Sequence, residues 1–336
     1  MAYTDIDKPS DYFNTKLYTG TGSEHAISGI GFAPNLVWLK CRSDANNPML
    51  FDTVRGATKN LYPNLTTAEG TEAQSLKSFD SDGYTLGTES DINGSSKTNV
   101  GWNWKAGTSF TNDASATGIG SIDSAGSVNQ DAGFSIVSFD LSGQSGNETI
   151  KHGLNTAPKV VITKRRSGGA GDWTSYFGAI GNSYLVLSST SAGATNTSFM
   201  NNTAPTSSVF TVGDPSWWGA NPFIAYCFSE KQGYSKFGSY TGNGSTDGTF
   251  SFTGFKVGWL MVKRTDSANS WIIMDNKRTT FNPMGEELKA EVSDAGNVAT
   301  RWDQLSNGFK LRNAGGAVNA SGGTYIYMAF AENPFV

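Results

Sequence analysis

The chain has 336 residues, a formal net charge of −4, and 37% hydrophobic and 12% aromatic residues. The charges are unclustered, so we expect no nucleic-acid binding, because a phosphate backbone requires a basic surface. No apolar run is long enough to cross a bilayer, which predicts no membrane insertion. The 40 glycines, with abundant Ser, Thr and Asn, favour short strands and turns over long helices.

Residues 1–12 form a polar N-terminal arm without the hydrophobic segment of a secretory signal, which indicates synthesis in a cytoplasm. A first β-rich unit is predicted over 13–106. A strand-like segment ends in Tyr18-Thr19-Gly20-Thr21-Gly22-Ser23, a continuous apolar run follows over 34–40, and a closing segment alternates Val100, Trp102 and Trp104 with smaller residues. Within this unit, Thr66-x-x-Glu69 resembles a capping box and predicts a short helix over 66–77.

Residues 107–132 are rich in Gly, Ser, Ala, Asn and Asp, which predicts a linker or a long extended connection. A second unit is predicted over 133–232. It repeats the same order with a degenerate turn motif at 139–143, an apolar run over 158–164, and a closing alternation of Ile224, Tyr226 and Phe228.

The third unit is predicted over 233–336. The turn motif returns as Tyr240-Thr241-Gly242-Asn243-Gly244-Ser245, the apolar run covers 257–263, and the closing alternation is Ile326, Met328 and Phe330. Two helical turns are predicted over 285–292. Asp82-Gly83 in the first unit and Asn307-Gly308 in the third mark hairpin turns, where glycine would supply a positive φ.

The threefold recurrence of these elements predicts the architecture. An apolar run without alternation is typical of a central strand that is buried on both faces. The alternating closing segments place bulky side chains on one face of a strand, which indicates three separately filled cores. We therefore predict an all-β fold of three tandem, related β-sandwiches with little helix. The sequence leaves open whether they pack about a pseudo-threefold axis. The lysines that close the apolar runs are predicted as solvated strand ends: Lys40, Lys164 and Lys263.

No catalytic site is predicted, because the chain lacks a nucleophile elbow and a phosphate loop followed by a helix. The two cysteines, Cys41 and Cys227, are far apart and are expected as buried or half-buried strand residues. The two histidines, His25 and His152, lie in polar, turn-like surroundings. We expect neither a metal site nor a cofactor.

Aromatic and basic residues offer the candidate binding groups. Trp217 and Trp218 follow Asp214-Pro215 in a predicted loop and are candidate contacts for a glycan or a protein partner. Core filling is the favoured explanation, followed by assembly contacts and then sugar binding. Trp173, Trp271 and Trp302 are expected at other loops or strand edges. Two basic groups, one at Arg42, Arg55 and Lys59 and one at Lys164-Arg165-Arg166, could bind an anion but are better explained as scattered solvated charge.

Several long segments carry a family resemblance. They are residues 2–13, the Tyr-Thr-Gly-x-Gly-Ser motifs, residues 51–59, residues 306–313 and residues 323–335. Together they resemble the repeat-bearing β-sandwich virion and appendage proteins of marine tailed phages, of the cyanophage and pelagiphage type. The resemblance covers nearly the whole chain, implies a role in the virion or one of its appendages, and brings no catalytic residues.

We therefore expect a non-enzymatic structural component of a tailed-phage virion, made in the bacterial host cytoplasm and located on the particle surface as a head decoration or a tail fibre. Its partners would be other virion proteins, in a homo-oligomer or multi-copy assembly, with a host-surface glycan as a further candidate. The alternative is a carbohydrate-binding adhesin or receptor-binding module. A polysaccharide hydrolase ranks third, because sandwich folds also host enzymes.

Overall fold

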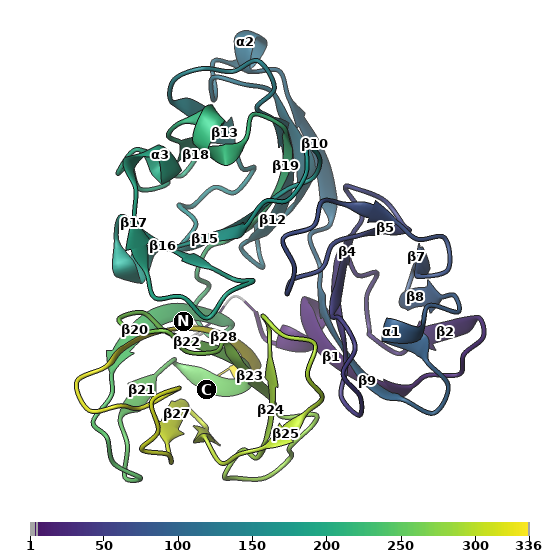
Figure 1. The fold of residues 1–336 in the computed structure, drawn as a ribbon, viewed down its shortest axis with the longest axis vertical. Coiled ribbons are helices and arrows are strands. Elements are labelled where there is room, and N and C mark those ends of the chain that lie inside the picture. The colour runs from purple at the N-terminus through teal and green to yellow at the C-terminus, as the bar shows by residue number, and fades with distance from the viewer. Residues whose placement is uncertain (1–3, 5, 335–336) are drawn as a thin grey trace.

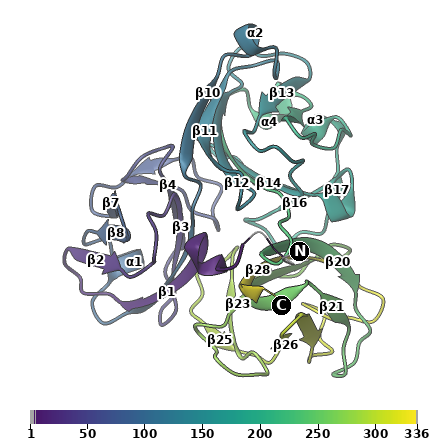
Figure 2. The same ribbon diagram turned by 180° about the vertical axis from the view of Figure 1, so that it is seen from behind.

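A computed structural model describes residue 4 and residues 6–334 of the chain. The described residues form three β-rich lobes around a common centre (Figure 1), and the same arrangement is seen from behind in Figure 2. Helices are limited to single turns, and the strands pair antiparallel, so the all-β prediction is confirmed. Residues 1–3 and 5 of the predicted N-terminal arm, and residues 335–336 of the predicted third unit, lie outside the described residues.

Unit 1 (13–106) is preceded by a short 3-10 turn, η1 (Pro9–Asp11), and contains a four-stranded sheet of order β1-β9-β3-β4 and a three-stranded sheet of order β2-β8-β7. Its elements are β1 (Phe13–Thr19), β2 (His25–Ser28), β3 (Leu36–Cys41), β4 (Met49–Asp52), β5 (Lys59–Asn60), β6 (Gly70–Thr71), β7 (Leu76–Asp80), β8 (Gly83–Leu86), α1 (Ser90–Asn93) and β9 (Thr98–Trp104).

Unit 2 (107–232) has an eight-stranded sheet of order β10-β11-β12-β19-β14-β15-β16-β17 and the pair β13-β18. Its elements are β10 (Thr108–Asn112), α2 (Ala114–Thr117), β11 (Ser124–Asn129), β12 (Phe134–Asp140), β13 (Glu148–Lys151), β14 (Val160–Arg165), β15 (Trp173–Phe177), η2 (Gly178–Ile180), β16 (Ser183–Val186), β17 (Ala194–Thr195), α3 (Thr197–Met200), β18 (Val209–Val212), α4 (Pro215–Trp218) and β19 (Pro222–Phe228).

Unit 3 (233–334) has a six-stranded sheet of order β20-β28-β22-β23-β24-β25 and a three-stranded sheet of order β21-β27-β26. Its elements are β20 (Ser235–Thr241), β21 (Phe250–Phe252), β22 (Phe255–Arg264), β23 (Ile272–Asp275), β24 (Glu286–Lys289), β25 (Asn297–Val298), β26 (Trp302–Leu305), β27 (Gly308–Leu311) and β28 (Thr324–Pro334). The three main sheets thus share one sub-order: β1-β9-β3-β4, β12-β19-β14-β15 and β20-β28-β22-β23.

The predicted linker over 107–132 is wrong. This segment forms β10 and β11, a hairpin that extends the unit 2 sheet through β11–β12 pairing. Its polar composition fits an edge position, where one strand face meets water. Phe110 on β10 is half-buried and packs on the interior of unit 2.

The two predicted helices are also wrong. Residues 66–77 hold β6 and the start of β7, and Glu69 pairs with Arg166 at 2.9 Å instead of closing a capping box. Residues 286–289 form β24, where Glu287 is buried and pairs with Arg301 at 2.6 Å. In both segments, the glutamate expected to stabilise a helix instead forms an ion pair with an arginine outside the segment.

The prediction that the bulky residues of the closing strands fill three separate cores is wrong. They lie together in one cluster, the central core, to which all three units contribute. Trp104, Phe228 and Phe330 occupy equivalent positions, and their rings lie 5.7–6.4 Å apart, centroid to centroid, in all three pairings. These side chains are at most 3% exposed, so the three main sheets face one another across a common centre.

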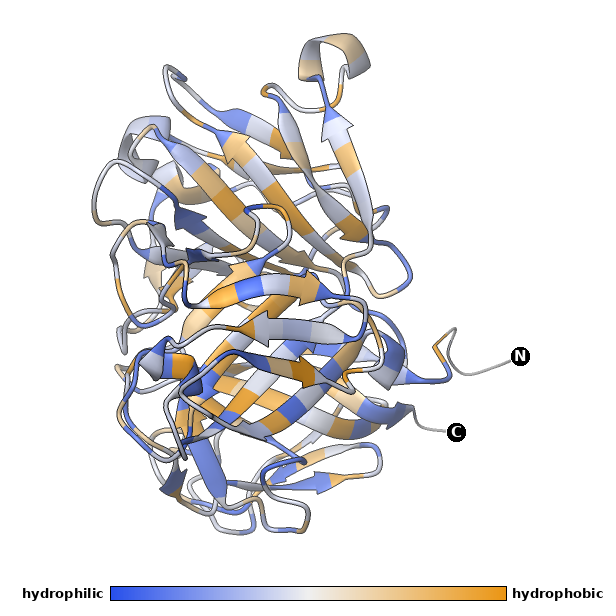
Figure 3. Cartoon of the chain, turned by 90° about the vertical axis from the view of Figure 1, so that its right-hand side faces the viewer, coloured by the Kyte–Doolittle hydropathy of each residue, from blue (hydrophilic) through white to orange (hydrophobic). Residues whose placement is uncertain are grey.

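The opposite face of each main sheet covers the interior of its own unit. There the closing strands carry mostly smaller residues, such as Gly101 in unit 1, Ala225 in unit 2 and Ala329 in unit 3. The smaller sheet of each unit closes that interior from outside. Figure 3 shows hydrophobic positions alternating with hydrophilic ones along the strands. Each unit therefore has a hydrophobic core of its own and also contributes to the central core that the three units share.

The prediction that the three strand-end lysines are solvated is wrong. Lys40, Lys164 and Lys263 are each 0% exposed. Each Nζ donates a hydrogen bond to a backbone carbonyl of another unit. Lys40 reaches Val292 at 2.7 Å, Lys164 reaches Thr66 at 2.9 Å, and Lys263 reaches Thr190 at 3.1 Å.

These contacts close a ring, in which unit 1 reaches unit 3, unit 3 reaches unit 2, and unit 2 reaches unit 1. A backbone hydrogen bond repeats the same cycle two residues after each lysine. The carbonyls of Arg42, Arg166 and Thr265 accept the amides of Gly296, Glu69 and Gly193 at 2.7, 3.0 and 2.8 Å. The three junctions thus share the same lysine and backbone contacts.

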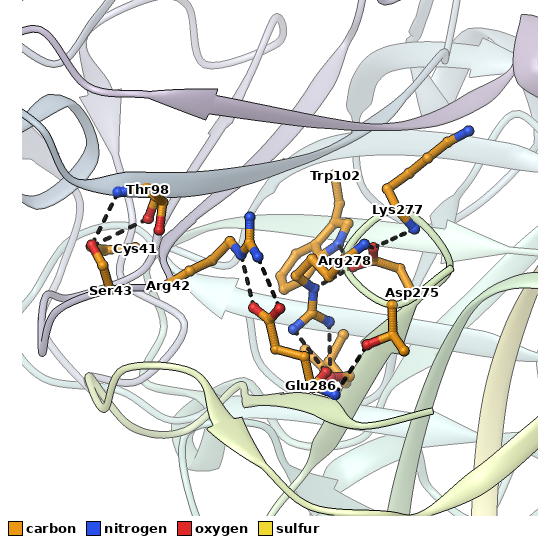
Figure 4. Close-up of polar contacts among 11 residues, drawn as sticks. Cys41, Arg42, Ser43, Thr98, Trp102, Asp275, Lys277, Arg278 and Glu286 are labelled. Carbon is orange, nitrogen blue, oxygen red and sulfur yellow. Dashed lines mark hydrogen bonds and ion pairs between the residues drawn. The ribbon is translucent and has the colours of Figure 1, made fainter. Parts of the chain in front are cut away.

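Side-chain polar contacts distinguish the junctions. Figure 4 shows the junction of units 1 and 3, where Arg42 binds Glu286 through two nitrogens at 2.8 Å and the Trp102 indole N–H donates to Asp275 at 3.0 Å. At the junction of units 2 and 1, Arg166 pairs with Glu69 and the Tyr226 hydroxyl donates to Asp52 at 2.7 Å.

The third junction lacks these polar pairs among the described residues. By strand register, Met328 takes the place of Trp102 and Tyr226, and Phe177 takes the place of the two aspartates. Both residues belong to the central core. An apolar pair thus replaces a donor and a carboxylate together, so neither buried partner is left unsatisfied.

Candidate functional site

The candidate site lies at one end of the unit 2 sandwich, around the short helix α4. The carboxylate of Asp214 caps this helix by accepting the Ser216 amide at 2.9 Å, and Gly219 ends it with a φ of 101°. This tight turn places Trp217 and Trp218 on neighbouring sides of one helical turn.

Trp218 is a core residue, which agrees with core filling, the explanation that the sequence favours. It is 6% exposed, and its ring stacks on Phe199 at 5.5 Å with an interplanar angle of 8°. Its indole N–H reaches the carbonyls of Ser198 and Phe199 at 2.9 and 3.0 Å. Both the ring and the polar atom are therefore already engaged inside unit 2.

Trp217 is half-buried and contacts the rings of Tyr184 and Phe199 edge-on, at 5.5 and 6.2 Å. It lines a surface cavity of about 320 Å³. The remaining lining residues come from the end of β14, the following loop, β15, β16, α4 and β19: Arg165, Ala170, Gly171, Asp172, Thr174, Tyr184, Trp218 and Phe223. Both tryptophans line this cavity, and Trp217 is the less buried of the two.

The basic groups noted in the sequence are mostly structural. Arg55 is buried and bonds Asp52 at 2.5 Å. Arg42, Lys164 and Arg166 belong to the junctions described above. Their interpretation as scattered solvated charge is therefore wrong for these four residues.

Arg165 differs from them. It is half-buried at the end of β14, and it makes no side-chain hydrogen bond or ion pair with any residue that the structure describes. Its Nε is buried without a partner. The sequence could name Arg165 as basic, but only the fold shows that it is the unpaired member of its group and lies in the same cavity as Trp217.

The other tryptophans that the sequence placed at loops or edges are core residues. Trp173, Trp271 and Trp302 are each 0% exposed. Trp173 and Trp271 follow the junction pattern, because their indole N–H groups donate to carbonyls of the neighbouring unit, Tyr62 at 2.9 Å and Val186 at 3.1 Å.

A second surface feature was missed in the sequence. Phe250 and Phe252 on β21 are 44% and 55% exposed. By register, the matching positions are Ala26 and Ser28 in unit 1, and Thr149 and Lys151 in unit 2. The two exposed phenylalanines are therefore particular to unit 3, and the fold of the other two units does not use them.

The cysteines and histidines form no shared site. Cys41 and Cys227 are free and buried, and burial raises the pKa of Cys227 to about 12. His152 is fully buried: Nε2–H donates to the Thr206 carbonyl at 3.1 Å, Nδ1 accepts the Leu154 amide at 3.2 Å, and burial lowers the pKa of the imidazole to about 4. Within residues 4 and 6–334, no group of three or more His, Cys, Asp or Glu is arranged to hold a metal ion.

The family model described as "Domain of unknown function (DUF7483)" matches residues 8–334. The chain belongs to this family. The match includes all three units, so the DUF7483 domain corresponds to the whole three-unit body rather than to one sandwich. No curated protein and no solved structure matches the chain. In the described part of this domain, none of the helices has the length and hydrophobicity needed to cross a membrane.

Proposed function

We propose that this protein is a non-enzymatic structural component on the surface of a tailed-phage virion, as a head decoration or as part of a tail fibre or related appendage. The resemblance of its long motifs to marine phage appendage proteins motivates this role. The observation that supports it is a single body, joined by a buried central core, whose outer surface carries exposed aromatic side chains outside the cores, among them Phe250 and Phe252 on β21. Such a body suits a rigid building block in a multi-copy assembly.

We also propose that the three units are related copies of one ancestral sandwich. Their main sheets share a strand order, and their junctions share the lysine and backbone contacts. Unit 2 has diverged furthest, since it gained β10 and β11 and lost the polar pair at its junction with unit 3.

The exposed phenylalanines of β21 are the proposed contact with a neighbouring subunit of the particle. The double variant Phe250→Ala/Phe252→Ser copies the matching residues of unit 1. Because these side chains are outside the cores, the variant should keep its melting temperature but enter particles less efficiently. The matched control is Ala26→Ser in unit 1. Normal incorporation of the double variant would exclude this surface as an assembly contact.

The virion role itself is tested by particle composition. Purified virions of the phage that encodes this chain are examined by mass spectrometry and by cryo-EM, with the structure fitted into the density. We expect stoichiometric copies on the head or tail exterior. Complete absence of the chain from infectious particles would overturn the proposal.

A second candidate function, carbohydrate binding for host attachment, is favoured by one observation, the cavity beside Trp217. A half-buried tryptophan offers an apolar ring to the C–H groups of a sugar, and the polar residues around it can bind hydroxyl groups. The two functions are compatible, since an appendage can be both structural and adhesive.

A further inference from the structure

The cavity beside Trp217 contains the guanidinium of Arg165, which has no hydrogen-bond or ion-pair partner among the described residues, and the carboxylate of Asp172 lines the same cavity. Arg165 projects from the end of β14, and a Cβ added at Gly171 would lie 2.9 Å from its Nε. The absence of a side chain at Gly171 therefore leaves room for the guanidinium. A guanidinium that is partly removed from water without a partner is unfavourable, so it is expected to pair with an anion.

Unit 3 provides an internal comparison. Arg264 occupies the position equivalent to Arg165, because Arg264 pairs with Tyr325 across β22–β28 as Arg165 pairs with Phe223 across β14–β19. Arg264 is neutralised by Asp266, two residues later, through two hydrogen bonds of 2.9 and 3.0 Å. Unit 2 has Ser167 at that place, so the intramolecular partner is lost while the arginine is retained.

The surroundings of Arg165 suit one ring-shaped ligand. The volume of about 320 Å³ is at the lower end of ligand-binding cavities. Trp217 and Tyr184 provide aromatic surface on one side. Asp172, exposed at the rim, can accept hydrogen bonds from hydroxyl groups.

We propose that this cavity binds an anionic saccharide residue, with its carboxylate or sulfate on Arg165, its ring against Trp217 and its hydroxyl groups near Asp172. This inference rests on the proposed host-attachment role and names the chemical class of its ligand. A bidentate arginine–anion pair in a partly buried site would supply the selectivity for acidic over neutral sugars.

The test measures binding of purified full-length chain to glucuronate-containing oligosaccharides, sulfated oligosaccharides and neutral glucose oligosaccharides of equal length, by calorimetry. We expect an acidic ligand to bind at least about tenfold more tightly than its neutral counterpart. Arg165→Met should remove this preference, Trp217→Leu should weaken both acidic and neutral ligands, and added salt should weaken only the acidic ones. The matched control, Arg264→Met, alters the paired arginine of unit 3 and should leave binding unchanged.

Melting temperatures show whether each variant is folded. If Arg165→Met is destabilised, Arg165→Lys decides, because it keeps the charge but loses the bidentate geometry and should reduce the preference only in part. Equal binding of acidic and neutral sugars, full binding by a folded Arg165→Met variant, or no binding of any of these ligands would each overturn the inference. The virion-composition experiment is independent of glycans, so failure here leaves the virion role standing.

Discussion

The buried lysines show how one residue type connects the three units. Lys164 and Lys263 lie 5.8 and 5.9 Å from the rings of Trp173 and Trp271, in addition to their carbonyl contacts. Burial lowers the pKa of each of the three lysines from 10.5 to about 8. The ammonium groups of Lys164 and Lys263 each donate to two carbonyls and that of Lys40 donates to one, which explains how a charge is tolerated beside an apolar core.

This shift predicts an unusual pH dependence of stability. Between pH 8 and pH 9, the native lysines release protons while the unfolded ones, with a pKa of 10.5, keep them. The unfolded state then binds more protons, so the free energy of unfolding should rise with pH, by at most about 1.4 kcal/mol per lysine and pH unit.

The measurement is urea unfolding at pH 7, 8 and 9 for the wild type and for Lys164→Met. The difference in unfolding free energy between them should grow with pH above 8. The exposed Lys8→Met is the control. Parallel pH profiles for the wild type and Lys164→Met would show that Lys164 does not titrate in this range.

The lowered pKa of His152 predicts a loss of stability at acidic pH. Its folded pKa of about 4 lies below the ordinary value of 6.5. As the pH falls from 6.5 towards 4, the unfolded state gains a proton that the folded state refuses, so wild-type stability should decline. His152→Gln should lose this part of the decline, as measured by thermal unfolding at pH 7, 6 and 5. An unchanged decline in this variant would assign it to other groups.

At the scale of elements, the Tyr-Thr-Gly-x-Gly-Ser motif is a docking point for a helical turn. The Tyr18 hydroxyl donates to the Ile92 carbonyl at 2.7 Å, and the side chain of Asn93 accepts the Thr21 amide at 3.0 Å. In unit 3, Tyr240 and Asn243 make the same contacts with Val318 and Asn319.

Unit 2 lacks both sides of this contact. By register, Leu141 replaces the first glycine, and Trp218 follows its helix cap at the same distance as Asn93 follows its own. Leu141 is fully buried in the unit 2 interior. The degenerate motif in the sequence thus reflects a different packing of α4, the helix that forms one wall of the Arg165 cavity.

The first glycine of the motif is required by close approach. A Cβ at Gly20 would collide with the backbone of Asn93 and Gly94. Gly20→Ala should therefore cost about 2–4 kcal/mol of unfolding free energy, because two backbone segments must separate. Gly143→Ala is the matched control, since Gly143 has a φ of 73° but no neighbour within 4 Å and should cost only about 1 kcal/mol. Equal losses in denaturant titrations would refute the steric explanation.

At the scale of the whole molecule, the shared core makes the three units depend on one another. Each main sheet buries one complete face only in the presence of the other two. The apolar surface on that face would be exposed in a single unit, which disfavours independent folding.

We therefore expect one cooperative thermal transition for the full chain. Trp104→Ala, Phe228→Ala and Phe330→Ala should each lower the stability of that same transition, by about 3–5 kcal/mol. Differential scanning calorimetry distinguishes this from three independent sandwiches, in which each variant would shift a separate peak. Appearance of such separate peaks would contradict the shared-core description.

Features that depend on neighbouring residues along the chain are predicted from the sequence, whereas features that depend on distant contacts are not. The strands over 34–40, 158–164 and 257–263 and the alternating closing strands are found as predicted, because local periodicity determines them. Asp82-Gly83 and Asn307-Gly308 do form hairpin turns, but neither glycine has a positive φ. Gly83 and Gly308 are needed because a Cβ would strike the carbonyl of the adjacent strand. The turn is thus predicted correctly, but the requirement for glycine comes from the neighbouring strand and not from the turn itself.

The sequence by itself determined that this is an all-β chain, where its main strands lie and which strand positions carry bulky side chains, because these depend on neighbours along the chain. Only the tertiary structure decided that the bulky faces meet in one central core, that three lysines bridge the units, and that Arg165 lies unpaired beside Trp217. Those outcomes depend on contacts between residues far apart in the chain, from 52 positions for Arg165 and Trp217 to 252 for Lys40 and Val292. Strand periodicity identifies the two faces of a strand, but it does not specify which part of the chain covers each face.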